Sequence, residues 1–164
     1  ALLHLFKRPL PEVFEEFFRK PLGCTDEFQW VGYEQGWTDV NGQRMMSVPG
    51  GSHWGGGVSI SARDQALIGV MLMGNGNFKG TQILSAKWLD MMQQPCDVAH
   101  YYGYLIWLNK DGAVFKDAPR SSWFALGAGS SVTWVDPKLE LVCIMRWIDA
   151  PKTNDCIAHI MRAL

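Results

Sequence analysis

The chain has 164 residues, of which 48% are hydrophobic and 19% are charged, and its formal net charge is -1 at pH 7. This composition predicts one globular domain of ordinary size, because a chain of this length buries roughly 70% of its unfolded surface. The small net charge gives no electrostatic reason to expect nucleic acid as a partner. No apolar run reaches the roughly 18 residues that a membrane span needs.

The first predicted elements are two helical segments. Residues 1–6 form a short apolar helix that starts without Met, in what reads as the middle of a helix, so we expect a cut within a longer protein. Residues 12–20 begin with acidic and end with basic side chains, which suits the helix dipole, and they carry one apolar stripe at helical spacing. Pro21, Leu22 and Gly23 end this helix.

Residues 29–57 are rich in Gly, Trp and polar side chains, and they predict a long loop with a short strand near residues 44–48. Loops longer than about 15 residues in a compact domain are commonly functional or mobile. The loop is followed by Ser61-Ala62-Arg63-Asp64, which has the form of a capping box. In such a box the Ser hydroxyl accepts from the third amide and the acid returns to the first.

Helical spacing continues from this box to Gly74, which we expect to supply the stop. The stretch 74–80, GNGNFKG, superficially resembles a phosphate-binding loop, but it follows a helix and its glycine spacing does not fit. A helix stop with a turn is the favoured interpretation. Ser85 begins the next helix, which ends before Pro95.

The period then changes from helical to alternating. Residues 102–109, 122–135 and 139–147 predict three strands, and the last two are close enough to pair as an antiparallel hairpin. Asp149 or Thr153 is expected to cap a final helix that runs to residue 164.

Common catalytic and metal-binding patterns are missing from the sequence. The four histidines have no metal-ligand spacing, and the four cysteines form no CxxC pair, so we expect no metal, no cofactor and free, largely buried thiols. The cellular compartment is left open. No serine lies in GxSxG, and no Ser or Thr is followed three residues later by Lys, so the chain holds neither common arrangement for a nucleophilic serine.

The stretch WFALGAGSSVTWVDP, residues 123–137, places two small-residue pairs in front of an apolar-polar alternation. Glycine in or beside a strand marks a bulge, a bend or a backbone that another group approaches closely. The residues alone are compatible with two interpretations, a simple bulge and a binding site.

Four stretches in consistent order resemble the C-terminal half of the serine β-lactamase-like superfamily, which includes the penicillin-binding proteins. The best resemblance is to its esterase, class C-like and 6-aminohexanoate-oligomer hydrolase branch. The stretches are LPEVFEEFFRKPLG (10–23), GGGVSISARDQALIGVMLMGNGNFKGTQILSAKWLDMM (55–92), YGYLIWL (102–108) and FALGAGSSVTWVDPKLELV (124–142).

The resemblance implies an α+β fold of the β-lactamase/transpeptidase type. Residues 1–101 would be the later part of the helical region with its Gly/Trp-rich loop. Residues 102–164 would be the last three antiparallel strands and the C-terminal helix of the α/β region. The nucleophile-bearing N-terminal half, with its Ser-x-x-Lys and Tyr motifs, would be absent and would be the partner of this chain.

The resemblance also implies site residues. Ala128 would supply a backbone N–H to the oxyanion hole, and Gly127 and Gly129 would keep the approach open. Trp123 would contact the substrate on the same strand. Trp54 and His53 would line the cleft from the helical side, although an ordinary loop histidine remains the more common role for the latter.

In many relatives this strand carries a three-residue motif that begins with a basic residue, and the motif falls here on Ala125-Leu126-Gly127. The missing basic residue argues against penicillin-type carboxylate recognition and fits the hexanoate-hydrolase branch better. A Gly-Gly-Gln continuation is replaced by Gly129-Ser130-Ser131. The Arg63-Asp64 pair, a hallmark of the family, is interpreted as structural.

The leading hypothesis is the C-terminal part of a serine hydrolase that cleaves a small-molecule ester or amide, inactive by itself. The alternatives are a catalytically inactive binding or scaffold module of the same fold, and a small domain that stands alone.

Overall fold

The computed structural model describes residues 2–32, 34–46 and 57–164. The chain divides into two compact units, Ala1–Asp64 and Gln65–Leu164, and each is described by itself. The boundary lies in the first turn of α4 (Ala62–Met73). The resemblance divides the chain differently, into a helical region at residues 1–101 and an α/β region at residues 102–164. That division stays a prediction.

The first unit opens with the predicted helices. The second of them is a continuous helical run with a π-helical turn in its middle, and it ends at Gly23, whose φ of 69° is left-handed. The N–H groups of Gly23 and Cys24 donate to the carbonyls of Lys20 and Arg19, a pair of bonds that closes the helix end. The elements are α1 (Leu2–Phe6), α2 (Leu10–Phe14), the π-helical turn (Glu15–Arg19) and α3 (Lys20–Leu22).

The expected long loop contains more strand than the sequence predicts. β2 (Trp37–Val40) and β3 (Gln43–Met46) form a hairpin, and β1 (Gln29–Trp30) pairs with β4 (Val58–Ser59). The hairpin turns at Asn41-Gly42, where both residues have positive φ (55° and 81°), the conformation of the favoured two-residue hairpin turn. The β3 strand accounts for the strand expected near residues 44–48, of which 47 and 48 lie outside the described residues.

The predicted start of α4 is half confirmed. The Ser61 hydroxyl accepts from the Asp64 N–H at 3.0 Å. The Asp64 carboxylate makes no return bond, because both of its oxygens lack a hydrogen-bond partner within the described residues. The left-handed residue at the helix end is Asn75 (φ 55°), and not Gly74 as expected.

The stretch 74–80 is a helix stop followed by a turn, as predicted. It carries β5 (Asn77–Phe78), which pairs with β6 (Thr81–Gln82). The next helix, α5 (Ala86–Met92), begins at Ser85, whose hydroxyl accepts from the Trp88 N–H.

The main sheet has four antiparallel strands in the described chain, in the order β10-β9-β8-β7, where the sequence predicts three. The expected strand over residues 122–135 is two strands, β8 (Trp123–Gly127) and β9 (Ser131–Asp136), separated by the turn 128–130. The expected strand over 102–109 shrinks to β7 (Trp107–Leu108), and β10 (Leu141–Met145) closes the other edge.

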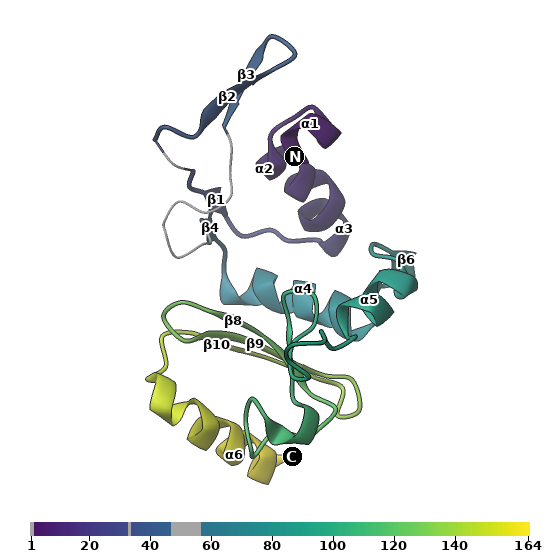
Figure 1. The fold of residues 1–164 in the computed structure, drawn as a ribbon, viewed down its shortest axis with the longest axis vertical. Coiled ribbons are helices and arrows are strands. Elements are labelled where there is room, and N and C mark those ends of the chain that lie inside the picture. The colour runs from purple at the N-terminus through teal and green to yellow at the C-terminus, as the bar shows by residue number, and fades with distance from the viewer. Residues whose placement is uncertain (1, 33, 47–56) are drawn as a thin grey trace. The chain divides into compact units, whose positions relative to one another are not determined.

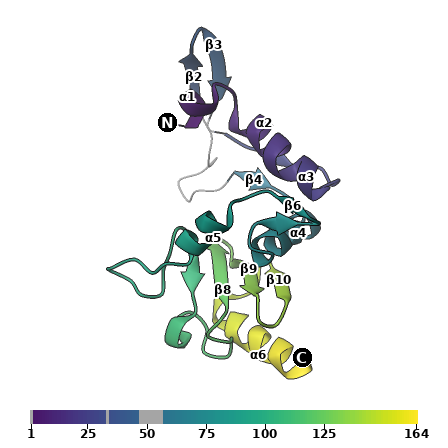
Figure 2. The same ribbon diagram turned by 90° about the vertical axis from the view of Figure 1, so that its right-hand side faces the viewer.

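Helices cover both faces of this sheet, with α4 on one face and α6 (Thr153–Ala163) on the other (Figures 1 and 2). Phe124 and Trp134 point to the α6 face and pack with Ile157, whereas Trp123 and Val135 point to the α4 face and pack with Leu72 and Met73. Alternate residues of β8 and β9 therefore contribute to two hydrophobic cores, one on each face of the sheet. Neither Asp149 nor Thr153 caps α6 with its side chain, which corrects that expectation.

Candidate functional site

The end of β8 has a free edge. The neighbouring strand β7 pairs only with Trp123 and Phe124, so within the described residues Ala125, Leu126 and Gly127 have a strand partner on the β9 side alone. All three are exposed, unlike the two buried residues before them. An unpaired strand edge offers backbone N–H and C=O groups to any group that approaches it.

The edge runs directly into the turn 128–130. Gly129 and Ser130 both have positive φ (72° and 54°), and these left-handed conformations reverse the chain so that Gly127 faces Ser131 across the hairpin. Ala128, the first residue of the turn, is exposed. Ala128 therefore lies on the surface, at the end of the free edge.

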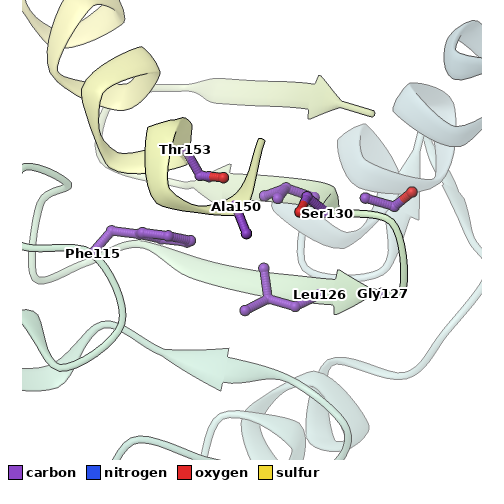
Figure 3. Close-up of a pocket in the computed structure, with 8 residues that line it drawn as sticks. Phe115, Leu126, Gly127, Ser130, Ala150 and Thr153 are labelled. Atoms are coloured by element: carbon purple, nitrogen blue, oxygen red, sulfur yellow. The ribbon is translucent and has the colours of Figure 1, made fainter. Parts of the chain in front are cut away.

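A pocket of about 240 Å³ opens beside this turn, on the α6 face of the sheet. Figure 3 shows Leu126 rising from β8 toward Ala150, with Phe115 to the left of this pair and Thr153 beyond Ala150. Hydroxyl groups of the turn and of α6 join a mostly apolar lining. The pocket is lined by Phe115, Leu126, Gly127, Ser130, Ser131, Val132, Ala150 and Thr153.

The structure brings three of the predicted site residues together: Gly127, Ala128 and Gly129 lie side by side at the end of β8. It places Trp123 elsewhere. That side chain is 2% exposed and packs in the core on the α4 face, and its contact with a substrate stays a prediction. The other two predicted residues, His53 and Trp54, lie outside the described residues.

Sequence reasoning missed the residues that reach the turn from far along the chain. Phe115, Ala150 and Thr153 line the pocket, and the Trp147 indole lies against Gly129. None of them belongs to a motif. The available signal was indirect: once β9 and β10 are recognised as an antiparallel pair, the end of β10 at Met145 must lie beside Val132, next to the turn.

The two glycines flanking Ala128 differ in what they tolerate. A Cβ on Gly127 would meet its nearest neighbour, the Ser131 Cβ, at 3.6 Å, which is an ordinary contact, and the φ of Gly127 is not positive. A Cβ on Gly129 would collide with the Trp147 ring, 2.7 Å from Cε3. The left-handed φ of Gly129 and the Trp147 ring beside it disfavour a side chain at position 129, whereas the chain itself leaves room for a methyl group at position 127.

The Arg63-Asp64 pair lies in the first unit. Arg63 is exposed and its guanidinium is 3.7 Å from the Asp26 carboxylate, a surface ion pair of small energetic weight. Asp64 is fully buried. Burial raises the pKa of the nearby Cys24 thiol, and the Asp64 charge raises it further.

The four cysteines are free, as expected, but each is only half-buried, where the sequence predicts largely buried thiols. Among the described residues no group of three or more His, Cys, Asp and Glu side chains is arranged to hold a metal ion. None of the described helices combines the length and apolar character required to cross a bilayer.

A comparison with protein-family models finds no match, and neither does a search among curated proteins. Solved structures do resemble the chain. A protein described as a 6-aminohexanoate-dimer hydrolase from Bacillus anthracis aligns with a TM-score of 0.50 and 21% identity over 66% of this chain and 31% of its own length. A protein described as a β-lactamase from Bacteroides dorei aligns with a TM-score of 0.56 and 14% identity over 93% of this chain and 50% of its own length.

The chain therefore has a mixed α/β fold of the β-lactamase-like type. It spans half or less of the length of these two proteins. At such low identity the likeness establishes the fold alone, because one fold hosts many chemistries and function depends on the site.

Proposed function

We propose that this chain forms part of a serine hydrolase that cleaves an ester or an amide through an acyl-serine intermediate. The observation that carries the proposal is the end of β8, where a free strand edge passes into an exposed turn between two glycines. The β-lactamase-like fold supports it, as do the two structural neighbours, whose names denote hydrolases.

In the proposed reaction, the oxygen of a serine outside these 164 residues attacks the carbonyl carbon of the substrate. The bond to the alcohol or amine then breaks, and the proton from the serine leaves with that group. Water adds to the acyl-serine in the same way and releases the acid and the serine. Both steps pass through a tetrahedral intermediate with a negative oxygen, which needs preorganised hydrogen-bond donors.

The N–H of Ala128 would be one such donor. Backbone amides suit this task because their direction is fixed by the fold before the substrate binds, and removing one oxyanion donor typically costs about 3 kcal/mol of barrier. Gly127 and Gly129 would leave the space beside this amide clear. The serine and its activating lysine would come from a segment that completes the site, since Ser-x-x-Lys does not occur in this chain.

The residues along the β8 edge also bear on the substrate. Ala125 and Leu126 carry no charge where a β-lactamase would place a basic residue, so the proposed substrate has no carboxylate at this position. A basic side chain on this edge would pair with a substrate carboxylate, whereas the apolar edge would leave the carboxylate without a partner.

A test follows from the difference between the glycines. In a protein that carries residues 1–164 with the proposed nucleophile-bearing segment, Gly127→Ala should fold with an unchanged melting temperature, because the added methyl group meets only an ordinary contact. It should lower kcat/KM for p-nitrophenyl esters about tenfold or more, since a displacement of about 1 Å near the reacting atoms costs up to about 100-fold.

A matched control is Gly42→Ala, the same addition of one methyl group in the β2–β3 turn. Gly42 has a φ of 81° and open space around it, so this variant should lose stability and keep its kcat/KM. Full activity of Gly127→Ala would reject the proposed approach of the substrate to Ala128.

A further inference from the structure

Trp147 follows β10 and stands out on the surface of the second unit. Its side chain is 82% exposed, although it is among the largest apolar groups that a chain can carry. Its φ is 56°, in the left-handed region that non-glycine residues rarely adopt. Burial does not explain this conformation, because the indole removes little of its surface from water.

The indole has one close partner in the turn. A Cβ built on Gly129 would lie 2.7 Å from Trp147 Cε3 and 3.1 Å from Cη2, so the ring rests directly against the Gly129 backbone. Trp147 is thereby held beside Ala128, the proposed oxyanion donor.

The pocket borders the same turn. Its lining is mostly apolar and includes the exposed Leu126 and the Phe115 ring. A volume of about 240 Å³ is below the range of about 300–1,000 Å³ for sites that enclose a whole drug-sized ligand, so it suits one alkyl chain or aryl group.

We propose that Trp147 and this pocket bind the apolar acyl group of the substrate, which makes medium-chain uncharged acyl esters or amides the preferred substrates. This inference rests on the proposed function. The acyl group stays beside the oxyanion donor during both acylation and deacylation, whereas the leaving group is present only for the first. Apolar surfaces that adjoin the donor's turn are therefore placed to hold the acyl group throughout.

The activity test compares p-nitrophenyl octanoate with p-nitrophenyl acetate in a protein that carries residues 1–164 with the nucleophile-bearing segment. Trp147→Ala should lower kcat/KM about tenfold for the octanoate, because several buried methylene groups lose their contact, and leave the acetate value nearly unchanged. Trp147→Phe should retain most of the octanoate activity. Trp37→Ala, which removes an exposed indole from β2, is the matched control and should leave both values unchanged.

A binding test uses the 164-residue chain itself, labelled with 5-fluorotryptophan. The fluorine resonance of Trp147 is the one lost in Trp147→Phe. Octanamide should shift this resonance, and acetamide should not.

The two tests separate the two proposals. A shifted Trp147 resonance in a protein that hydrolyses no ester retains the acyl site and rejects the hydrolase. If the parent protein and Trp147→Ala both hydrolyse esters with the same ratio of kcat/KM for the octanoate to kcat/KM for the acetate, the hydrolase is retained and the acyl site is rejected. An octanamide titration that leaves the Trp147 resonance in place overturns the acyl site.

Discussion

Two fully buried aspartates show how differently this fold treats the same side chain. Asp136 accepts hydrogen bonds from the hydroxyls of Ser121 and Ser122 and from the N–H groups of Lys138 and Leu139, at distances of 2.6–3.1 Å. Asp64, in the other unit, has no hydrogen-bond partner on either carboxylate oxygen within the described residues. The sequence marks both as turn or cap residues, and only the structure distinguishes them.

This contrast predicts that one substitution has unequal costs at the two positions. Asp136→Asn should lower the free energy of unfolding by about 2 kcal/mol, because an amide cannot accept from all four donors and charge-assisted bonds are lost. Asp64→Asn should change it by no more than about 1 kcal/mol, since only the interaction with the α4 dipole is removed. Urea unfolding of both variants measures this, and an equal cost at both positions would contradict the hydrogen-bonding difference.

At the scale of elements, local signals in the sequence predicted the helix starts well. Ser61 and Ser85 accept the bonds expected of helix caps, because a hydroxyl before a helix acts on amides three residues away, whatever the tertiary fold is. The turn within residues 122–135 was missed. Its Gly129-Ser130 conformation interrupts a run that alternates on both sides, and alternation by itself does not show where a strand reverses.

The candidate site was predicted only where it is local. Gly127, Ala128 and Gly129 adjoin along the chain, so a single stretch of sequence carried them. Trp123 was named a substrate contact from the family resemblance, and the sequence does not tell which face of its strand is covered, whereas in the structure α4 covers it. Trp147 and the pocket residues depend on how β10 and α6 return to the turn, which no local pattern records.

The packing of α4 on β10 gives the prediction at this scale. A Cβ on Gly69 would lie 2.5 Å from Val142 Cγ1, so the helix approaches the strand through its glycine. Gly69→Ala should lower the free energy of unfolding by about 1 kcal/mol, because overpacking of about 1–3 kcal/mol outweighs the gain of about 1 kcal/mol in helix propensity.

The double variant Gly69→Ala, Val142→Ala tests the cause. Removing the two Val142 methyl groups makes room for the new one, so the cost of Gly69→Ala should fall in this background and the pair should couple by about 1 kcal/mol. Strict additivity of the two substitutions in urea unfolding would show that the close approach of α4 and β10 does not set the cost.

At the scale of the whole molecule, the features of the candidate site lie together in one unit. The free edge of β8, the turn and the pocket all belong to the second unit. The two structural neighbours are longer, and this chain spans 31% and 50% of their lengths. Under the proposed function, the missing groups are a nucleophilic serine and its base.

The last prediction concerns reactivity with a fluorophosphonate probe, which modifies serines only when a neighbouring base activates them. The 164-residue chain should remain unlabelled, because none of its serines lies in Ser-x-x-Lys or GxSxG. A protein that adds the nucleophile-bearing segment should be labelled at one serine of that segment, and Gly127→Ala should slow the labelling, since the probe forms a tetrahedral adduct beside Ala128. Rapid labelling of the isolated chain would reject this division of roles. A complete protein that stays unlabelled would favour a non-catalytic binding module, in which the open edge of β8 receives a ligand without cleaving it.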